Sequence, residues 1–221
     1  SCIVKFDWQD FVMTIRKGEQ WGEPCSAPIG LPEFATERDL GFHVRGNGSI
    51  PEAILKSGTL IQALGIAAPT PDRERIKVLI DLIKVAYTDL DGRDRDDIAV
   101  GSVLIGRRSW SGDLCIVSNC GYLGTRELLS KAHPNDGVMD VLTVSSLMPF
   151  MQRLQAWRRI PTSSHLPHPD ISTKQIERFS WPLEGNESPL KRARLVIDGE
   201  ALGLVKSVRM QVIPDAITLY V

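Results

Sequence analysis

The feature that most constrains the fold is a series of short apolar runs, rich in β-branched residues, in the second part of the chain. Gly, Asp-Gly or Pro bounds each run, and the runs cover 98–106, 113–124, 138–147, 194–204, 208–214 and 217–221. Apolar runs of strand length separated by such turns are typical of antiparallel sheets that fold back on themselves. The pattern therefore predicts a mainly β protein with a sandwich or meander.

Residues 1–75 have a different texture, with frequent Gly and Pro breaks. They predict a small α/β segment, with one or two strands over 6–18 and a helix over 58–66. The segment is too short to close a sheet alone, so we expect it to precede a second domain over 76–221. Residues 75–89 leave two alternatives open, because their apolar residues have helical spacing whereas their β-branched content favours strands.

A clear amphipathic helix is predicted over 148–160, MPFMQRLQAWRRI. Phe150, Leu154 and Trp157 are expected on one face, and three arginines (Arg153, Arg158 and Arg159) away from it. The helix either packs on a sheet with its arginines solvated, or lies in the headgroup region of a membrane.

The composition is that of an ordinary globular protein, with 43% hydrophobic and 24% charged residues among 221. A formal net charge of −1 argues against a nucleic-acid binder. No apolar stretch is long enough to span a membrane, and we expect no leader segment. The four cysteines (Cys2, Cys25, Cys115 and Cys120) have no metal-ligand spacing. They predict reduced thiols in a cytoplasmic protein.

Residues 195–203, LVIDGEALG, combine two signals. Asp-Gly between apolar residues predicts a type I′ hairpin turn. Asp198 and Glu200 also place two carboxylates on one short stretch, as proton-transfer and phosphoryl-transfer sites often require. These two side chains are our candidate catalytic residues.

Residues 118–144, SNCGYLGTRELLSKAHPNDGVMDVLTV, resemble the C-terminal domain of the diacylglycerol kinase-type lipid kinases, a family that includes sphingosine kinases. The matching positions are Asn119, Gly124, Ala132, Asp136, Gly137, Asp140 and Val141. The resemblance continues through 163–171 and 196–200 to 213–221. It implies a β-sandwich of the lipid kinase/NAD kinase type after a truncated α/β segment.

The resemblance also implies roles for single residues. Asp198 would be the general base on a lipid hydroxyl, with Glu200 helping to organise magnesium. Asp136, with a backbone carbonyl near Val138, would bind a structural magnesium ion. Pro-Asn-Asp-Gly at 134–137 is equally consistent with a self-sufficient Asx turn.

The chain departs from the family where ATP should bind. Gly46, Asn47, Gly48 and Ser49 are similar to the first phosphate loop, but Asn47 replaces its metal-binding Asp. Gly58 and Thr59 are similar to the second loop, from which an Asn-Asp segment is deleted. A surface turn and the start of a helix are the alternative interpretations of these two stretches.

We therefore expect a lipid kinase-like protein that binds a lipid or other amphiphile and has lost kinase activity. The alternative is an active ATP-dependent lipid kinase whose nucleotide site a partner completes. Magnesium is the expected cofactor, with ATP only if activity is retained. The sequence is also compatible with a homodimer and with peripheral contact at the inner face of a membrane.

Overall fold

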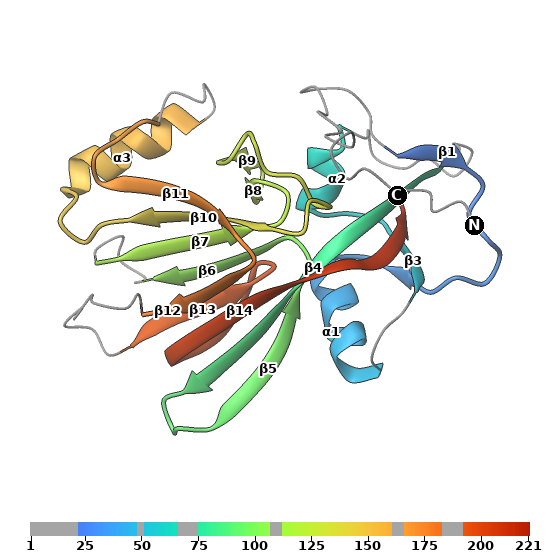
Figure 1. Cartoon of the computed structure of the whole chain (residues 1–221), viewed down its shortest axis with the longest axis horizontal. Coiled ribbons are helices and arrows are strands. Elements are labelled where there is room, and N and C mark those ends of the chain that lie inside the picture. Colours follow the sequence, from blue (N-terminus) through green and yellow to red (C-terminus); the bar gives the residue numbers. More distant parts are fainter. Residues whose placement is uncertain (1–21, 48–50, 66–74, 107–111, 161–165, 183–191) are drawn as a thin grey trace, which may run out of the picture.

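A computed structural model describes residues 22–47, 51–65, 75–106, 112–160, 166–182 and 192–221 (Figure 1). The strands expected over 6–18 lie outside the described residues. The helices are α1 (Glu37–Asn47), α2 (Thr59–Ala63) and α3 (Phe150–Arg159). The strands are β1 (Glu23–Cys25), β2 (Glu33–Phe34), β3 (Glu52–Leu55), β4 (Arg75–Asp89), β5 (Asp94–Ala99), β6 (Ser102–Gly106), β7 (Leu114–Ser118), β8 (Tyr122–Leu123), β9 (Arg126–Glu127), β10 (Met139–Val144), β11 (Ile171–Ile176), β12 (Arg178–Trp181), β13 (Ala193–Ile197) and β14 (Glu200–Tyr220).

Most of these strands join one curled sheet with the order β1-β4-β14-β13-β6-β7-β10-β11. β3 and β12 also pair with β14, and β5 pairs with β4. The sheet curls so that β12, β14, β4 and β5 face β13, β6, β7 and β10 across the main core (Figure 1). Buried aliphatic side chains from both layers, such as Val85, Val117 and Leu195, fill the space between them. The mainly β, sandwich-like fold expected from the sequence is confirmed.

The segment that the sequence left open between helix and strand is the long strand β4. Alternate residues are buried along each half, but the buried face changes near the middle, between Ile80 and Ile83. Asp81 marks this change, and its buried carboxylate accepts backbone N–H groups from Gly137 at 2.7 Å and Asp215 at 2.8 Å. β4 therefore contributes to two cores, because its two halves face opposite sides of the sheet.

The second core lies under α1 and α2. β2 and β3 run parallel, with α1 between them in sequence, and β3 continues in parallel onto the end of β14. Leu40 of α1 and Leu60 of α2 are fully buried against these strands. The helix expected over 58–66 is present as α2, whereas α1 occupies a stretch that the sequence analysis treated as irregular.

The start of α1 has a capping box, which is the local reason for the helix. Asp39 donates its N–H to the Thr36 hydroxyl at 3.1 Å, and its carboxylate accepts the N–H of Thr36 at 3.1 Å. Two acidic residues in the first turn, Glu37 and Asp39, and Arg45 in the last turn suit the helix dipole.

The predicted helix over 148–160 is confirmed as α3, which covers the outer face of β7 and β10 over a third core. The predicted arrangement of its side chains is wrong in part. Arg153 is buried, whereas Phe150 is exposed. The Arg153 guanidinium donates to the carbonyls of Met148 at 3.0 Å and Gly112 at 2.7 Å, and to that of Ser145. An arginine can face inward here because loop carbonyls accept its N–H groups.

Candidate functional site

The Asp-Gly pair at 198–199 forms the predicted tight turn between β13 and β14. Asp198 and Gly199 have φ angles of 46° and 85°, and Ile197 pairs with Glu200 across the turn. Positive φ at both central positions is the type I′ conformation, which Asp-Gly adopts with little strain. The hairpin prediction is confirmed.

The Asp198 carboxylate closes the bend between β5 and β6. Its two oxygens accept backbone N–H groups from Val100 at 2.9 Å, Gly101 at 2.9 Å and Ser102 at 2.8 Å. Burial raises the pKa of Asp198, and these N–H groups together with the charge of Arg38 oppose that shift. The candidate base is therefore also a structural acceptor that joins the β13–β14 hairpin to the β5–β6 bend.

Sequence reasoning missed Glu37, a carboxylate beside Asp198. Glu37 has only 5% of its surface exposed, and it accepts the N–H of Leu60 at 2.6 Å and the hydroxyl of Thr59 at 3.0 Å. Burial, with the neighbouring Asp198 as the second cause, raises the pKa of Glu37 to about 7. The capping box that starts with Thr36 is the sequence signal that could have placed this residue in the first turn of a helix.

Two glycines allow these segments to approach closely. A Cβ atom at Gly101 would lie 2.4 Å from the Thr59 hydroxyl oxygen and 2.6 Å from Glu37 Oε2. A Cβ atom at Gly58 would lie 2.5 Å from Glu37 Cδ. We call Glu37, Thr59, Gly101 and Asp198 the carboxylate cluster. It joins the first turns of α1 and α2 to the β5–β6 bend and the β13–β14 hairpin.

The thiol of Cys120 lies at the edge of the carboxylate cluster, 3.4 Å from the Thr59 hydroxyl oxygen. Burial raises the pKa of Cys120 to about 12, with Glu37 as the second cause. A thiol with so high a pKa is a poor nucleophile at neutral pH. Cys115 and Cys120 are free thiols, in agreement with the sequence analysis.

Glu200, the second candidate catalytic residue, is paired with Arg38. The same guanidinium binds Asp97 with two hydrogen bonds of 2.9 Å. The side chain of Asp97 has no exposed surface, whereas half of the Glu200 side chain is exposed. The two terminal nitrogens of Arg38 therefore neutralise the buried carboxylate of Asp97, while its Nε binds Glu200.

The residues predicted to bind nucleotide are separated in the structure. Thr59 belongs to the carboxylate cluster, and Gly58 lies against Glu37 of the same cluster. Gly46 and Asn47 form the end of α1, while Gly48 and Ser49 lie outside the described residues. The last turn of a helix presents carbonyl oxygens and a negative dipole end, which do not favour a phosphate. Nucleotide binding at 46–49 and 58–59 stays a prediction.

The predicted metal residues form a turn. The Asp136 carboxylate accepts the backbone N–H of Val138 at 3.1 Å, as an Asx turn requires. Burial raises the pKa of Asp136. In the part of the chain that the structure describes, no three His, Cys, Asp or Glu side chains are grouped as metal ligands would be. The magnesium site at Asp136 and Val138 stays a prediction.

Comparison with known proteins agrees with the sandwich-like fold. Residues 88–221 match the YegS C-terminal NAD kinase beta sandwich-like domain. This match covers more than half of the chain, and the chain belongs to this diacylglycerol kinase-like family. The resemblance found in the sequence is confirmed at this level.

Among solved structures, the chain is similar to a candidate diacylglycerol kinase from Bacillus anthracis str. Sterne. The two share 16% identity with a TM-score of 0.34, over 72% of this chain and 44% of the other. This chain thus spans less than half of that protein. No curated protein sequence matches the chain.

Proposed function

We propose that the protein is a lipid-binding member of the diacylglycerol kinase-like family that does not transfer phosphate efficiently. The observation that carries this proposal is the position of Glu37. Its carboxylate occupies the first turn of α2, where it binds the Leu60 N–H and the Thr59 hydroxyl. These are the groups that a phosphate would need there, and a second carboxylate at 198 adds negative charge.

The remaining groups of the site also have internal partners. Asp198 accepts three backbone N–H groups, and Glu200 is paired with Arg38. A metal-bound nucleotide would have to displace Glu37 and break the pairing of Glu200. The described residues therefore do not fit ATP and magnesium in this arrangement.

Lipid binding is supported by an apolar cavity under α3. The cavity has a volume of about 50 Å³, and residues of both the helix and the outer face of the sheet line it. Its lining includes Ile116, Leu142, Ala156, Trp157 and Ile160. A space of this size holds only a few water molecules, so the tail of an amphiphile enters only as α3 moves outward.

The test is to extract the purified protein and identify bound lipids by mass spectrometry. We expect a glycerolipid or another amphiphile whose acyl chains are of one kind. Ala156→Trp fills the cavity and should lower the amount bound, whereas Gln155→Trp, on the exposed side of the same helix, should not. Protein without any lipid, or equal amounts in the two variants, would contradict the proposal.

A second candidate function is ATP-dependent phosphorylation of a lipid hydroxyl, with a partner completing the nucleotide site. It is favoured by one observation, which is that Thr59 of the second phosphate loop lies in the same cluster as Asp198. Nucleotide at about one hundred times its dissociation constant stabilises a protein by about 2.7 kcal/mol. A rise in Tm with magnesium-ATP that Thr59→Val removes would support this candidate, and an unchanged Tm would count against it.

A further inference from the structure

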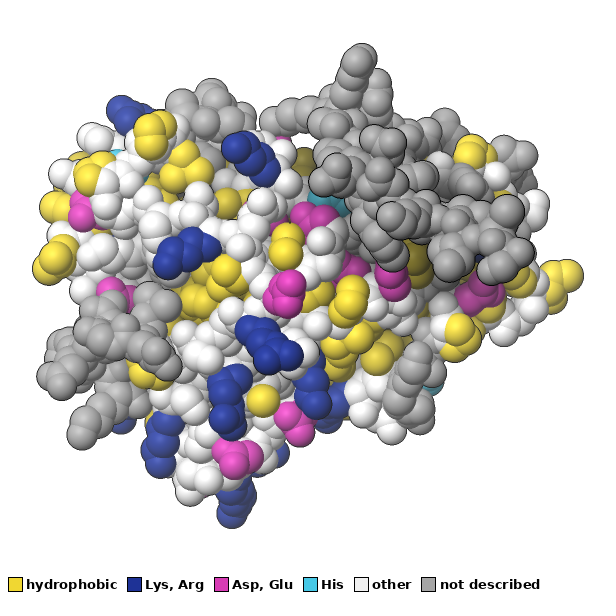
Figure 2. Space-filling model, in the orientation of Figure 1, with side chains coloured by type: hydrophobic (Ala, Val, Ile, Leu, Met, Phe, Trp, Pro, Cys, Tyr) yellow, Lys and Arg dark blue, Asp and Glu magenta, His cyan; other side chains and the backbone are white. Residues whose placement is uncertain are grey.

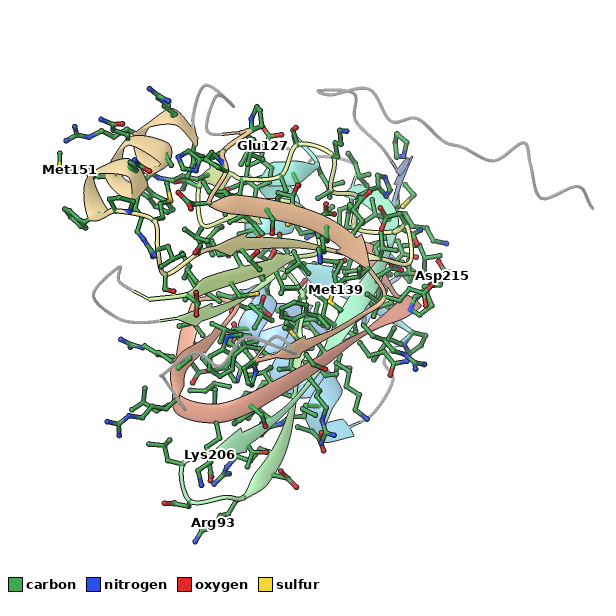
Figure 3. All side chains as sticks on the ribbon, turned by 60° about the vertical axis from the view of Figure 1, so that its left-hand side comes forward. Arg93, Glu127, Met139, Met151, Lys206 and Asp215 are labelled. Carbon is green, nitrogen blue, oxygen red and sulfur yellow. The ribbon has the colours of Figure 1, made fainter. Side chains whose placement is uncertain are left out.

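The outer face of α3 carries large apolar side chains in contact with solvent. Leu147, just before the helix, is 84% exposed, and Phe150 and Met151 in its first turn are 60% and 61% exposed. Met151 projects from the outer side of α3, at one extremity of the molecule (Figure 3). Exposed apolar groups clustered in this way commonly mark a contact surface.

The same face of α3 is basic toward its C-terminal end. Arg158 and Arg159 are exposed, and they lie eight residues after Phe150 and Met151, which places them along the same side of the helix. The ten residues of α3 include no Asp or Glu. Hydrophobic and basic side chains lie side by side over this part of the molecule (Figure 2).

Buried residues on the opposite side fix which face points outward. Arg153 is anchored to the loop carbonyls, and Ile160 is buried in the third core. The helix therefore cannot turn Phe150 and Met151 inward without losing these contacts. We call Leu147, Phe150, Met151 and Arg158 the α3 tip.

We propose that the α3 tip seats the protein on an anionic lipid bilayer. The three apolar side chains would enter the boundary between headgroups and acyl chains, while Arg158 meets lipid phosphates. A bilayer fits better than a protein partner, because the exposed apolar side chains lie beside exposed arginines on a helix without acidic residues. The inference goes beyond the proposed function, since contact with a bilayer does not require a lipid in the cavity under α3.

Among the described helices, none is both long and apolar enough to cross a bilayer. The contact proposed here is interfacial, with the helix lying along the membrane surface. It would place the helix that covers the apolar cavity next to the lipids that could fill it.

Vesicle co-sedimentation tests the proposal. The full chain should sediment with vesicles of phosphatidylcholine and phosphatidylglycerol, and much less with vesicles of phosphatidylcholine alone. Phe150→Ser with Met151→Ser should weaken binding about tenfold or more, and Arg158→Gln about fivefold. Ile29→Ser, which changes a fully exposed apolar residue elsewhere, is the matched control and should bind as the wild type does.

Two results would overturn the proposal. One is equal binding by the wild type and the Phe150→Ser, Met151→Ser variant when both have the same Tm. The other has three parts: the wild type does not bind vesicles, light scattering shows that it is a dimer, and the Phe150→Ser, Met151→Ser variant is a monomer. That result would mean that the α3 tip contacts a second copy of the chain. If the protein binds vesicles but no lipid can be extracted from it, the α3 tip is supported and the proposed function is contradicted. Failure of this proposal can therefore be distinguished from failure of the proposed function.

Discussion

The carboxylate of Glu37, in the first turn of α1, accepts the backbone N–H of Leu60 in the first turn of α2 at a distance of 2.6 Å. This bond places an internal carboxylate at the start of a second helix, beside Asp198. Two carboxyl groups in a buried site do not ionise together easily, so one of them holds its proton to higher pH. Burial is the first cause of the raised pKa of Glu37 and the charge of Asp198 is the second, while the Leu60 N–H opposes the shift. The same arrangement makes this site a poor fit for a nucleotide phosphate.

The raised pKa of Glu37 predicts a pH-dependent stability. The folded-state pKa of about 7 lies above the ordinary value of 4.5, so the folded state holds this proton where the unfolded state releases it. The stabilising contribution is complete below about pH 4.5 and is lost as the pH rises through 7. Urea unfolding between pH 4 and pH 8 measures the decline, which should amount to about 3 kcal/mol from this residue.

Glu37→Gln isolates this contribution, because glutamine is neutral at every pH and can keep the Leu60 hydrogen bond. Relative to the wild type, this variant should gain about 3 kcal/mol between pH 4 and pH 8. A constant difference between the two proteins over this range would show that Glu37 titrates normally. Asp91→Asn, in an exposed turn, serves as the control and should follow the wild type.

Asp198→Asn should destabilise the fold. Both oxygens of Asp198 accept backbone N–H groups from Val100, Gly101 and Ser102. Asparagine replaces one of these oxygens with an NH2 group, which cannot accept, so at least one N–H group loses its hydrogen bond. Buried donors left without a partner cost about 1–3 kcal/mol each, so we expect a loss of about 2 kcal/mol in urea unfolding. A loss below about 0.5 kcal/mol would match an ordinary surface position and contradict the structural role.

Arg38 and Glu200 should differ in their contributions to stability. Arg38→Met leaves the buried Asp97 with the Ile98 N–H at 2.8 Å and, of its two arginine partners, only Arg45 at 3.4 Å, and should cost about 3 kcal/mol. Glu200→Gln changes a half-exposed partner and should cost less than about 1 kcal/mol. Chemical denaturation of both variants checks this order, and a larger loss for Glu200→Gln would show that the pairing is misassigned.

Two arginines of α3 provide a similar contrast. Arg153→Met removes the donor for three loop carbonyls and should destabilise the protein by about 3 kcal/mol. Arg158→Met, on the exposed side, should change stability by less than about 0.5 kcal/mol. Thermal unfolding of the pair measures the difference, and equal Tm values would contradict the buried position of Arg153.

The sequence was sufficient where local chemistry determines structure. Asp198-Gly199 predicted the hairpin because few other dipeptides accept positive φ twice, and the bounded apolar runs predicted the sandwich. β4 could not be assigned locally, since its buried face changes at Asp81 and this breaks the simple alternation of a strand. The change depends on contacts with residues 137 and 215, which are remote in sequence.

The candidate site was only half predictable for the same reason. Asp198, Glu200 and Thr59 were found from motifs. The capping box at Thr36 could have placed Glu37 and Arg38 in the first turn of a helix, but only the fold brings them to the site. The inward side of α3 was misassigned at Arg153, because hydrophobic spacing alone does not show that loop carbonyls can bind a buried guanidinium.

Phosphate transfer from labelled ATP to diacylglycerol in mixed micelles with magnesium, compared between the wild type and Asp198→Asn, tests the central claim most directly. If the carboxylates of this site serve the fold and not phosphoryl transfer, both proteins will give product only at the background level. Transfer by the wild type that Asp198→Asn abolishes, while the variant stays folded, would contradict the claim and identify the protein as an active lipid kinase.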